Sequence, residues 1–303
     1  MSDSGKIYVI GSSNTDMVVK SSKLPAPGET VIGETFLMNA GGKGANQAVA
    51  AARLGGHVTM AARIGNDVFG RQAVGQFEIE NIGTGFITVD DELPSGVALI
   101  NVDAKGENCI SVAPGSNSKL SPDDLKELLE NISAQDIALL QLEIPIATAD
   151  FAIRKCFDKK SRVILNPAPA CPLPDDLFPC LYLITPNETE AGLLTGIEVT
   201  DSYSAAQAAQ QLRTKGVANV IITLGAKGAF LLTDSFSGLI DAPKVTAVDT
   251  TAAGDCFNGA IAVALAEEMT LEQAVVFASK AAALCVTKLG AQSSMPYRSE
   301  MPV

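Results

Sequence analysis

The chain has 303 residues, of which 47% are hydrophobic, and its 22 basic and 34 acidic residues give a formal net charge of −12. This balance argues against a general binder of nucleic acid or of an anionic membrane, and no apolar run is long enough to span a bilayer. One histidine and six cysteines without C-x-x-C spacing make a zinc site or a disulfide framework unexpected, so we expect a cytoplasmic protein with reduced thiols.

Short β-branched segments alternate along the chain with segments of helical periodicity. The strand candidates are 7–10, 58–64, 137–142, 163–165, 182–185 and 220–224, and the helix candidates include 45–54, 122–132, 148–157 and 205–215. Strands that alternate with helices of this length indicate βαβ units. The predicted fold class is therefore α/β, a three-layer sandwich around a mostly parallel central sheet.

Two segments interrupt this alternation. Residues 16–39 show strand-like alternation around a turn at 25–28 (PAPG). Residues 95–112 predict a hairpin whose strands, 97–102 and 108–112, flank a turn at 103–106 (DAKG). We expect these pieces, about 14–40 and 95–113, to form a small β-rich lid on one α/β domain that spans residues 1–303.

A glycine-rich loop at residues 41–46 (GGKGAN) precedes the first long helix candidate. A Walker A loop would need glycine at position 37 and serine or threonine at 44, and the chain meets neither condition. A dinucleotide fingerprint that starts at Gly42 would need a third glycine where Gln47 stands. The loop is therefore either a structural turn or a backbone that closely approaches a ligand, with Lys43 and Asn46 as donors.

Polar residues, or glycine and proline, follow the ends of several predicted strands. The carboxyl ends of parallel strands meet at one edge of a sheet, which is where open α/β sheets bind their ligands. These strand-end residues are Asn14, Asp16, Glu143, residues 166–169 (NPAP), residues 185–187 (TPN) and residues 223–225 (TLG). The sequence thus predicts a single ligand-lined rim.

Residues 249–255 (DTTAAGD) form a loop of small residues that ends in an acidic residue at a helix start. Phe257, Ile261 and Leu265 follow at helical spacing, so we expect a helix that begins near Gly254. The first N–H groups of a helix lack internal partners and attract anions. A carboxylate at such a place suggests phosphoryl transfer if Asp255 takes a proton from a hydroxyl group. The alternative is that Asp255 only caps the helix.

Three motifs together resemble those of a known family. Residues 41–46, 187–190 (NETE) and 249–255 look like the motifs of the ribokinase-like (phosphofructokinase B type) sugar kinases, and the match extends from about residue 7 to about residue 296. Asn14 with Asp16, residues 27–30 (PGET) and residues 166–169 also fit. The resemblance implies ATP-dependent phosphorylation of D-ribose at its 5-hydroxyl, which gives ribose 5-phosphate.

The resemblance also implies roles for individual residues. Asp255 looks like the general base, and the backbone amides of Ala252, Ala253, Gly254 and Asp255 look like an anion hole. The positions that match sugar-binding residues are Asn14, Asp16, Gly42, Lys43, Asn46, Glu143 and Asp255. The positions that match nucleotide-binding residues are Asn187, Thr223, Leu224, Gly225, Ala226, Lys227, Gly228, Gly254 and Ser279.

Metal ions and partners follow from the same resemblance. Asn187 and Glu190 match a motif that arranges Mg²⁺ through water molecules. An activating monovalent cation, usually K⁺, is implied at a site made by Asp249, Thr251, Cys285, Lys288, Gly290 and Ser294. Relatives use the lid to cover the sugar and often to join two subunits. The expected partners are therefore ATP, a small sugar and a second copy of the chain, with no nucleic acid and no membrane.

The sequence leaves the substrate open. A related kinase could act on deoxyribose, a ketose or a nucleoside, although Asp16 favours a sugar with vicinal hydroxyls and the few aromatic residues disfavour a nucleoside. Ser279 stands where relatives often carry a larger hydrogen-bonding residue, so the nucleotide preference is not fixed. A non-catalytic sugar sensor is a further alternative. Such a sensor would be expected to lack Gly254 or Asp255, and this chain has both.

Overall fold

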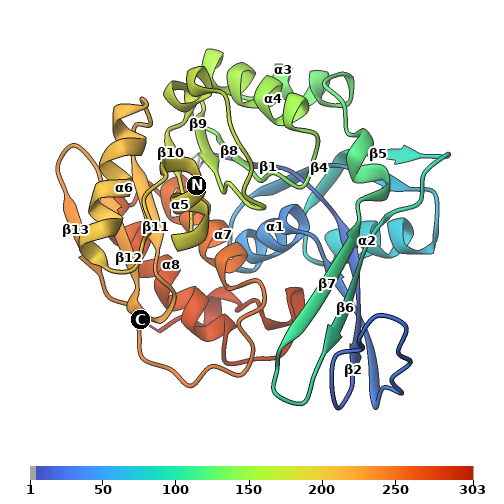
Figure 1. The fold of residues 1–303 in the computed structure, drawn as a ribbon. Helices are drawn as coiled ribbons and strands as arrows, with labels where there is room; N and C mark the ends of the chain where they lie inside the picture. The colour runs from blue at the N-terminus through green and yellow to red at the C-terminus, as the bar shows by residue number, and fades with distance from the viewer. Residues whose placement is uncertain (1–4, 303) are drawn as a thin grey trace.

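The computed structural model describes residues 5–302, which form two β-sheets and the helices around them (Figure 1). The larger sheet has nine strands in the order β13-β12-β11-β10-β9-β8-β1-β4-β5, and the smaller has four in the order β3-β2-β6-β7. The larger sheet comprises β1 (Ile7–Ile10), β4 (Val58–Gly65), β5 (Gly83–Asp90), β8 (Ile137–Leu140), β9 (Arg162–Leu165), β10 (Leu183–Ile184), β11 (Val220–Thr223), β12 (Ala229–Leu232) and β13 (Ser237–Ile240). The smaller comprises β2 (Asn14–Lys20), β3 (Thr35–Gly41), β6 (Gly96–Val102) and β7 (Asn108–Ala113).

Helices cover both faces of the larger sheet, because its strands are apolar on both sides. In β1, Ile7 and Val9 enter one hydrophobic core and Tyr8 and Ile10 enter the other. The first core is covered by α1 (Lys43–Arg53), α2 (Val68–Ile79), α7 (Ala253–Ala266) and α8 (Leu271–Cys285), and the second by α3 (Lys126–Asn131), α4 (Ile146–Asp158), α5 (Glu188–Thr195) and α6 (Ser202–Thr214). The predicted three-layer α/β sandwich is confirmed, and its sheet is parallel except where β12 runs antiparallel to both neighbours.

Some helices and strands end at other residues than predicted, because their backbone groups form hydrogen bonds outside the helix or the sheet. The predicted strand at 137–142 ends at Leu140, since the Leu142 N–H donates to the Ala168 carbonyl. The predicted helix at 122–132 divides into a 3₁₀ turn, η2 (Asp123–Leu125), and α3. The remaining 3₁₀ segments are η1 (Gly115–Lys119), η3 (Asp175–Cys180), η4 (Gly225–Lys227), η5 (Gln292–Ser294) and η6 (Arg298–Glu300). None of the helices in residues 5–302 is long and apolar enough to cross a membrane.

The smaller sheet projects from the body at the lower right of Figure 1, below α2, and is tied to the body by Asn117. The Asn117 side chain is 1% exposed, accepts a hydrogen bond from the Ser13 N–H at 2.9 Å, and donates to the Pro114 carbonyl at 3.0 Å and to Asn14 Oδ1 at 2.8 Å. Gly96 starts β6 at the same point, where a Cβ atom would lie 2.2 Å from Asn14 Oδ1. One asparagine therefore joins the points where β2 and β6 begin and β7 ends.

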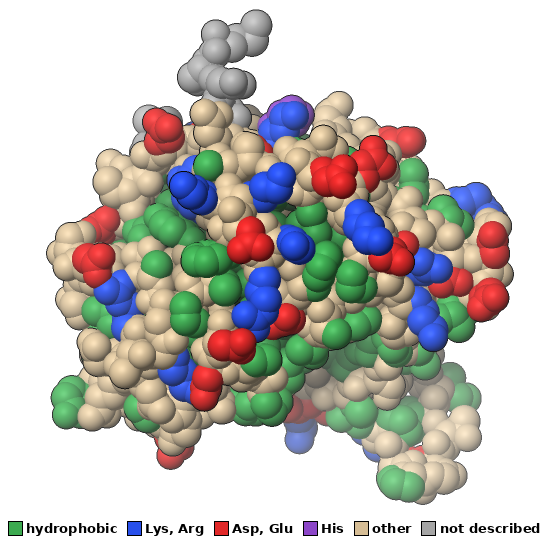
Figure 2. Space-filling model, turned by 90° about the horizontal axis from the view of Figure 1, so that it is seen from above, with side chains coloured by type: hydrophobic (Ala, Val, Ile, Leu, Met, Phe, Trp, Pro, Cys, Tyr) green, Lys and Arg blue, Asp and Glu red, His purple; other side chains and the backbone are tan. Residues whose placement is uncertain are grey.

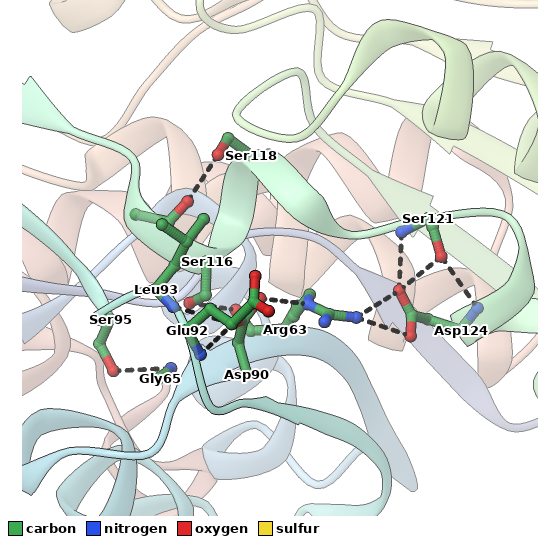
Figure 3. Close-up of polar contacts among 11 residues, drawn as sticks. Arg63, Gly65, Asp90, Glu92, Leu93, Ser95, Ser116, Ser118, Ser121 and Asp124 are labelled. Atoms are coloured by element: carbon green, nitrogen blue, oxygen red, sulfur yellow. Dashed lines mark hydrogen bonds and ion pairs between the residues drawn. The ribbon is translucent and has the colours of Figure 1, made fainter.

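An ion-pair network lies next to this junction (Figure 3). Arg63 of β4 extends between Asp90 of β5, whose Oδ2 lies 2.8 Å from its Nε, and Asp124 of η2, whose Oδ1 lies 3.1 Å from its Nη1. Backbone N–H donation from Leu93, followed by the Arg63 guanidinium, lowers the pKa of Asp90 to about 2. The charges in this network fix the loop that leads into β6.

Candidate active site

β2 carries two of the predicted sugar-binding residues where the smaller sheet leaves the body. Asn14 is buried, and its Oδ1 already accepts the hydrogen bond from Asn117. Asp16 lies two residues further on, and therefore on the same face of the strand. Burial, followed by repulsion from the carboxylates of Glu143 and Asp255, raises the pKa of Asp16 to about 6. The structure thus brings three of the predicted acidic residues into one electrostatic neighbourhood.

The glycine loop starts α1 directly beneath this strand. Gly42 has a φ of 89°, and a Cβ atom there would lie 2.7 Å from the Asn14 nitrogen, so glycine is needed for the close approach. Glu143 Oε2 accepts hydrogen bonds from the Lys43 backbone N–H at 3.0 Å and from Ser12 Oγ at 2.5 Å. Sequence reasoning missed Ser12, although its position just beyond β1 is the strand-end signal that identified the other rim residues.

Lys43 supplies positive charge at the centre of the site. Burial acts against its charged form, but surrounding carboxylates outweigh that effect and raise its pKa. These carboxylates are, in decreasing order of effect, those of Asp255, Glu143, Glu190 and Asp16. Lys43 therefore connects the predicted sugar side of the site with the predicted magnesium motif.

Asp255 lies in the first turn of α7 and is 6% exposed. Its Oδ2 accepts a hydrogen bond from Asn46 Nδ2 and its Oδ1 accepts one from Gln47 Nε2, both at 2.9 Å. Burial raises the pKa of Asp255, whereas the Lys43 charge and the two amide donors act in the opposite direction. A desolvated carboxylate held in one orientation is well suited to accept a proton from a bound hydroxyl group.

The backbone before Asp255 leaves N–H groups free at the start of α7. Ala252 caps the helix with a left-handed φ of 59°, which turns the chain sharply into the first turn. The Ala253 N–H has only a long contact, 3.3 Å, to the Thr250 carbonyl, and within residues 5–302 the N–H groups of Gly254 and Asp255 have no backbone acceptor outside the helix. The helix begins at Ala253, one residue before the predicted start, with the positive end of its dipole at this loop.

A cavity of about 480 Å³ opens on the other side of this helix start. The predicted nucleotide-binding residues that line it are Asn187, Thr223, Gly225, Ala226, Gly228, Gly254 and Ser279. Leu224 is instead buried in the core and Lys227 Nζ donates to the Thr200 carbonyl, so these two do not line the cavity. Part of the wall was not predicted, because it comes from apolar residues without a motif, namely Pro243, Val245, Ala247, Phe257, Ala282, Ala283 and Val286.

The predicted magnesium motif starts α5 at the edge of this cavity. Asn187 Oδ1 accepts the Glu190 N–H at 2.8 Å, and Glu190 Oε2 accepts the Asn187 N–H at 2.9 Å, which is a reciprocal capping box. Burial raises the pKa of Glu190, although the Asn187 N–H and the Lys43 charge oppose it. The second Glu190 oxygen takes no part in the cap and is of the hard oxygen type that Mg²⁺ prefers, which fits contact through water.

The predicted cation site brings two loops together through Asp249. Its Oδ1 accepts the Thr251 N–H and its Oδ2 accepts the Gly290 N–H, both at 2.9 Å. Burial acts to raise the pKa of Asp249, but these donors outweigh it and hold the pKa below its usual range. Cys285 and Ser294 lie together behind the loops, with 3.0 Å between Sγ and Oγ.

The oxygen donors of these loops fit a large monovalent cation. The carbonyls of Lys288 and Gly290 accept no hydrogen bond from any residue in the range 5–302. The same part of the chain contains no cluster of three or more histidine, cysteine, aspartate or glutamate residues that could hold a metal ion. The loops therefore offer carbonyls and one carboxylate rather than a transition-metal site.

Comparison with known proteins gives a consistent result. The family model described as "pfkB family carbohydrate kinase" matches residues 4–298. The chain is 44% identical to ribokinase of Haemophilus influenzae over 97% of this chain and 96% of that protein, and 39% identical to deoxyribokinase of Salmonella typhi over 96% and 95%. The solved structure of Arabidopsis thaliana ribokinase with ribose and ATP is 32% identical, covers 98% of this chain and 97% of that one, and superposes with a TM-score of 0.89.

Proposed function

The chain belongs to the pfkB family of carbohydrate kinases, and we propose that it is a ribokinase, which transfers the γ-phosphoryl group of ATP to the 5-hydroxyl of D-ribose. The observation that carries this proposal is the place of Asp255. It lies at a helix N-terminus with free amides, between the polar rim of Asn14, Asp16 and Glu143 and the 480 Å³ cavity. Phosphoryl transfer needs the attacking hydroxyl, the base that takes its proton and the nucleotide to meet at one point.

The sugar lies on the polar rim in this proposal. Asn46 donates to Asp255 through Nδ2, while its Oδ1 is buried and has no hydrogen-bond partner among residues 5–302. Such an acceptor suits a hydroxyl donor, because a buried carbonyl oxygen is costly to leave unpaired. Asp16 and Glu143 add carboxylate acceptors for further hydroxyl groups, which accounts for the choice of a polyhydroxylated substrate.

The transfer then proceeds by general base catalysis. Asp255 accepts the proton of the 5-hydroxyl as that oxygen attacks the γ-phosphorus, and the bond from the γ-phosphorus to the bridging oxygen of ADP breaks. The amides of Ala252, Ala253, Gly254 and Asp255 stabilise the charge on the transferring group, an effect typically worth about 10²–10³ in rate for a single aligned donor. ADP and ribose 5-phosphate leave, and the proton passes from Asp255 to solvent.

Two cations complete the proposal. Mg²⁺ would accompany ATP and neutralise phosphate charge, and Asn187 and Glu190 would order its water shell. K⁺ would be held by Asp249, the carbonyls of Cys285, Lys288 and Gly290, and the oxygens of Thr251 and Ser294. Because Asp249 bonds both the Thr251 and Gly290 amides, the cation loop is continuous with the loop that forms the anion hole.

We further propose that the smaller sheet, from segments of about 14–40 and 95–113, acts as a lid over the sugar and as the contact between two subunits. Asp16 projects from it toward the site, which supports a covering role. The protein is expected to work in the cytoplasm, where the six cysteines, all free in the structure, stay reduced.

A deoxyribokinase is the second candidate, favoured by the 39% identity to the Salmonella typhi enzyme. The two sugars differ only at the 2-hydroxyl, and every other hydroxyl group is common to both. A site built to hydrogen-bond a hydroxyl group discriminates strongly against a substrate that lacks it. The ratio of kcat/KM for the two sugars therefore decides between the candidates.

ADP release with Mg²⁺ and ATP tests the proposal across D-ribose, 2-deoxyribose, fructose, fructose 6-phosphate and adenosine. We expect the highest kcat/KM with D-ribose, and a severalfold loss when K⁺ is replaced by tetramethylammonium. A higher value with 2-deoxyribose would establish the second candidate. Ribose binding without turnover would identify a sensor instead, and an unchanged rate without K⁺ would remove the cation site.

The variant Asp255→Asn keeps the shape of the side chain and removes the base. We expect turnover on ribose to fall by about 10²–10⁴, the usual contribution of a general base, with ribose binding retained. Asp123→Asn, at an exposed position of η2, is the matched control and should leave turnover unchanged. Near-normal turnover in Asp255→Asn would show that the base lies elsewhere.

A further inference from the structure

A side chain without a role in the proposed sugar or nucleotide contacts lies directly behind Asp255. Gln47 follows Asn46 in α1, is 0% exposed, and donates from Nε2 to Asp255 Oδ1 at 2.9 Å. Asn46 holds the other oxygen, Oδ2. The two carboxylate oxygens are thus held from different sides, one by a residue of the sugar rim and the other by a residue of the protein interior.

A second glutamine fixes the first. Gln141 follows β8, is also 0% exposed, and donates from Nε2 to Gln47 Oε1 at 2.6 Å. An ionised carboxylate only accepts hydrogen bonds, so Gln47 must turn its Nε2 toward Asp255 and its Oε1 away. Gln141 must then present its own Nε2 to that oxygen. Reversing either amide would oppose two oxygens, so the charge on Asp255 dictates both orientations.

Packing alone does not explain the two hydrogen-bonded glutamines, Gln47 and Gln141, because one oxygen of Gln141 is left unpaired. Gln141 Oε1 is buried and has no hydrogen-bond partner in the described range, 5–302. It lies against Gly11, where a Cβ atom would come within 2.1 Å of it. An unpaired buried acceptor costs stability, and an apolar side chain at 141 would avoid that cost. We infer that the two glutamines serve the Asp255 carboxylate, to which Gln47 donates.

We propose that Gln47, oriented by Gln141, is a positioning residue that fixes the orientation of the Asp255 carboxylate and keeps it ionised for proton transfer. This inference rests on the assignment of Asp255 as the base in the proposed function. Gln47 acts through Asp255 and does not touch the sugar. An N–H donor stabilises the charged form of a carboxylate, so loss of the Gln47 donor raises the pKa of the base.

Several other ionisable groups interact electrostatically with the Asp255 carboxylate, and a substitution of Gln47 leaves these groups in place. They are Lys43, Glu143, Asp16, Glu190, Cys256 and Cys285. Only Lys43 among them favours the ionised form, and the amide donors of Asn46 and Gln47 act with it against the effect of burial.

The pH dependence of kcat/KM for ribose in Gln47→Met tests this inference, because methionine keeps the length of the side chain and removes its donor. We expect the acid limb of the profile to move up by about one to two pH units, since a hydrogen bond to a charged group has about that effect on a pKa. Below the limb the loss should be about 10–100-fold, and above it the rate should recover toward that of the wild type. Damage to the fold would instead lower kcat/KM at every pH.

Gln141→Met is the second variant and should shift the limb in the same direction by a smaller amount. Gln76→Met, in α2 and outside the site, is the matched control and should leave the profile unchanged. If Gln47→Met does not fold, as judged by circular dichroism, Gln141→Met carries the test. An unshifted acid limb in the folded variants overturns the inference.

The same series separates this inference from the proposed function. A wild-type protein that turns over none of the tested substrates, or an Asp255→Asn variant with normal turnover, overturns both. An active wild type with an inactive Asp255→Asn and an unshifted Gln47→Met overturns only the positioning role.

Discussion

The acidic residues of the candidate site lie where their charge is unfavourable for the fold. Asp16 is partly buried beside the carboxylates of Glu143 and Asp255, and its pKa is raised to about 6. A carboxyl group whose folded pKa exceeds its usual value near 3.8 favours the folded state in its neutral form. That contribution is complete below about pH 4 and is lost as the pH rises through 6. A carboxylate at this position therefore destabilises the free protein at neutral pH.

Asp16→Asn should consequently stabilise the protein without substrate, by an amount that grows between about pH 4 and pH 6 and is complete above pH 6. A shift from 3.8 to about 6 corresponds to roughly 3 kcal/mol at pH 7.5, and the difference should vanish near pH 4. Urea unfolding at the two pH values measures it, with the exposed Asp123→Asn as control. A stability gain of equal size at pH 4 and pH 7.5 would contradict this account, as would a loss at pH 7.5. Ribose affinity should fall in Asp16→Asn.

Among single residues, the sequence predicted those that belong to a motif, but it did not predict the residues that hold them in place by hydrogen bonds. Asn46 and Asp255 were predicted separately, and the structure joins them by a hydrogen bond across 209 positions. Gln47 and Gln141 were not predicted. Their hydrogen bond joins residues that lie 94 positions apart in the sequence, and a single glutamine in a helix does not form a recognisable motif. Only the packing of α1, α7 and β8 brings these side chains together.

Among the elements, α1 and α7 make a close contact that sets the position of Asp255, the proposed base. Gly259 of α7 faces α1, and a Cβ atom there would lie 2.7 Å from the Gln47 carbonyl oxygen and 2.7 Å from the Ala50 Cβ. The absence of a side chain thus allows the two backbones to touch. Asn46, Gln47 and Asp255 all lie at this contact.

Gly259→Ala should force the two helices apart. We expect a loss of about 1–3 kcal/mol in the free energy of unfolding, typical of overpacking, together with a lower kcat as Asp255 loses its alignment. Gly75→Ala in α2 is a matched control, since a Cβ atom there meets nothing within 4 Å. It should stabilise the protein by about 0.5–1 kcal/mol through helix propensity. A fully active Gly259→Ala variant would show that the helix spacing is not critical.

Elements with a strong local pattern were predictable, and those defined by their neighbours were not. β1 and the hairpin strands β6 and β7 were predicted within one residue of their ends. β10 has only two residues, because its backbone pairs with β9 and β11 over a very short stretch. The antiparallel β12 and β13 lie outside the predicted strand series and complete the edge of the sheet.

At the scale of the whole molecule, charge and apolar surface are distributed differently. Figure 2 shows basic and acidic side chains interspersed over one face of the body. The smaller sheet instead exposes an outer patch of Phe36, Met38 and Leu99, which are 59%, 47% and 51% exposed. Cross-strand pairing places these residues on one face and Asp16 on the other. An exposed apolar face next to unpaired edge strands is typical of an interface between subunits.

We expect a dimer in sedimentation velocity at micromolar concentration, formed through this outer patch. Leu99→Glu should shift the protein to a monomer, because burying a carboxylate in an apolar interface is costly. Ile79→Glu is the matched control, since Ile79 is 74% exposed but lies on α2. A wild-type monomer would remove the proposal, and a Leu99→Glu dimer would place the interface elsewhere.

Because of the contact between α1 and α7, the orientation of Asp255 does not depend on the position of the smaller sheet. Asn46 and Asp255 both belong to the body and stay 2.9 Å apart through side chains that the smaller sheet does not carry. If that sheet acts as the proposed lid, its movement changes how long a sugar stays bound and how much water reaches it. The direction from which Asp255 meets the hydroxyl group in the proposed mechanism is set by the contact of α1 with α7, and is the same whether that lid is open or closed.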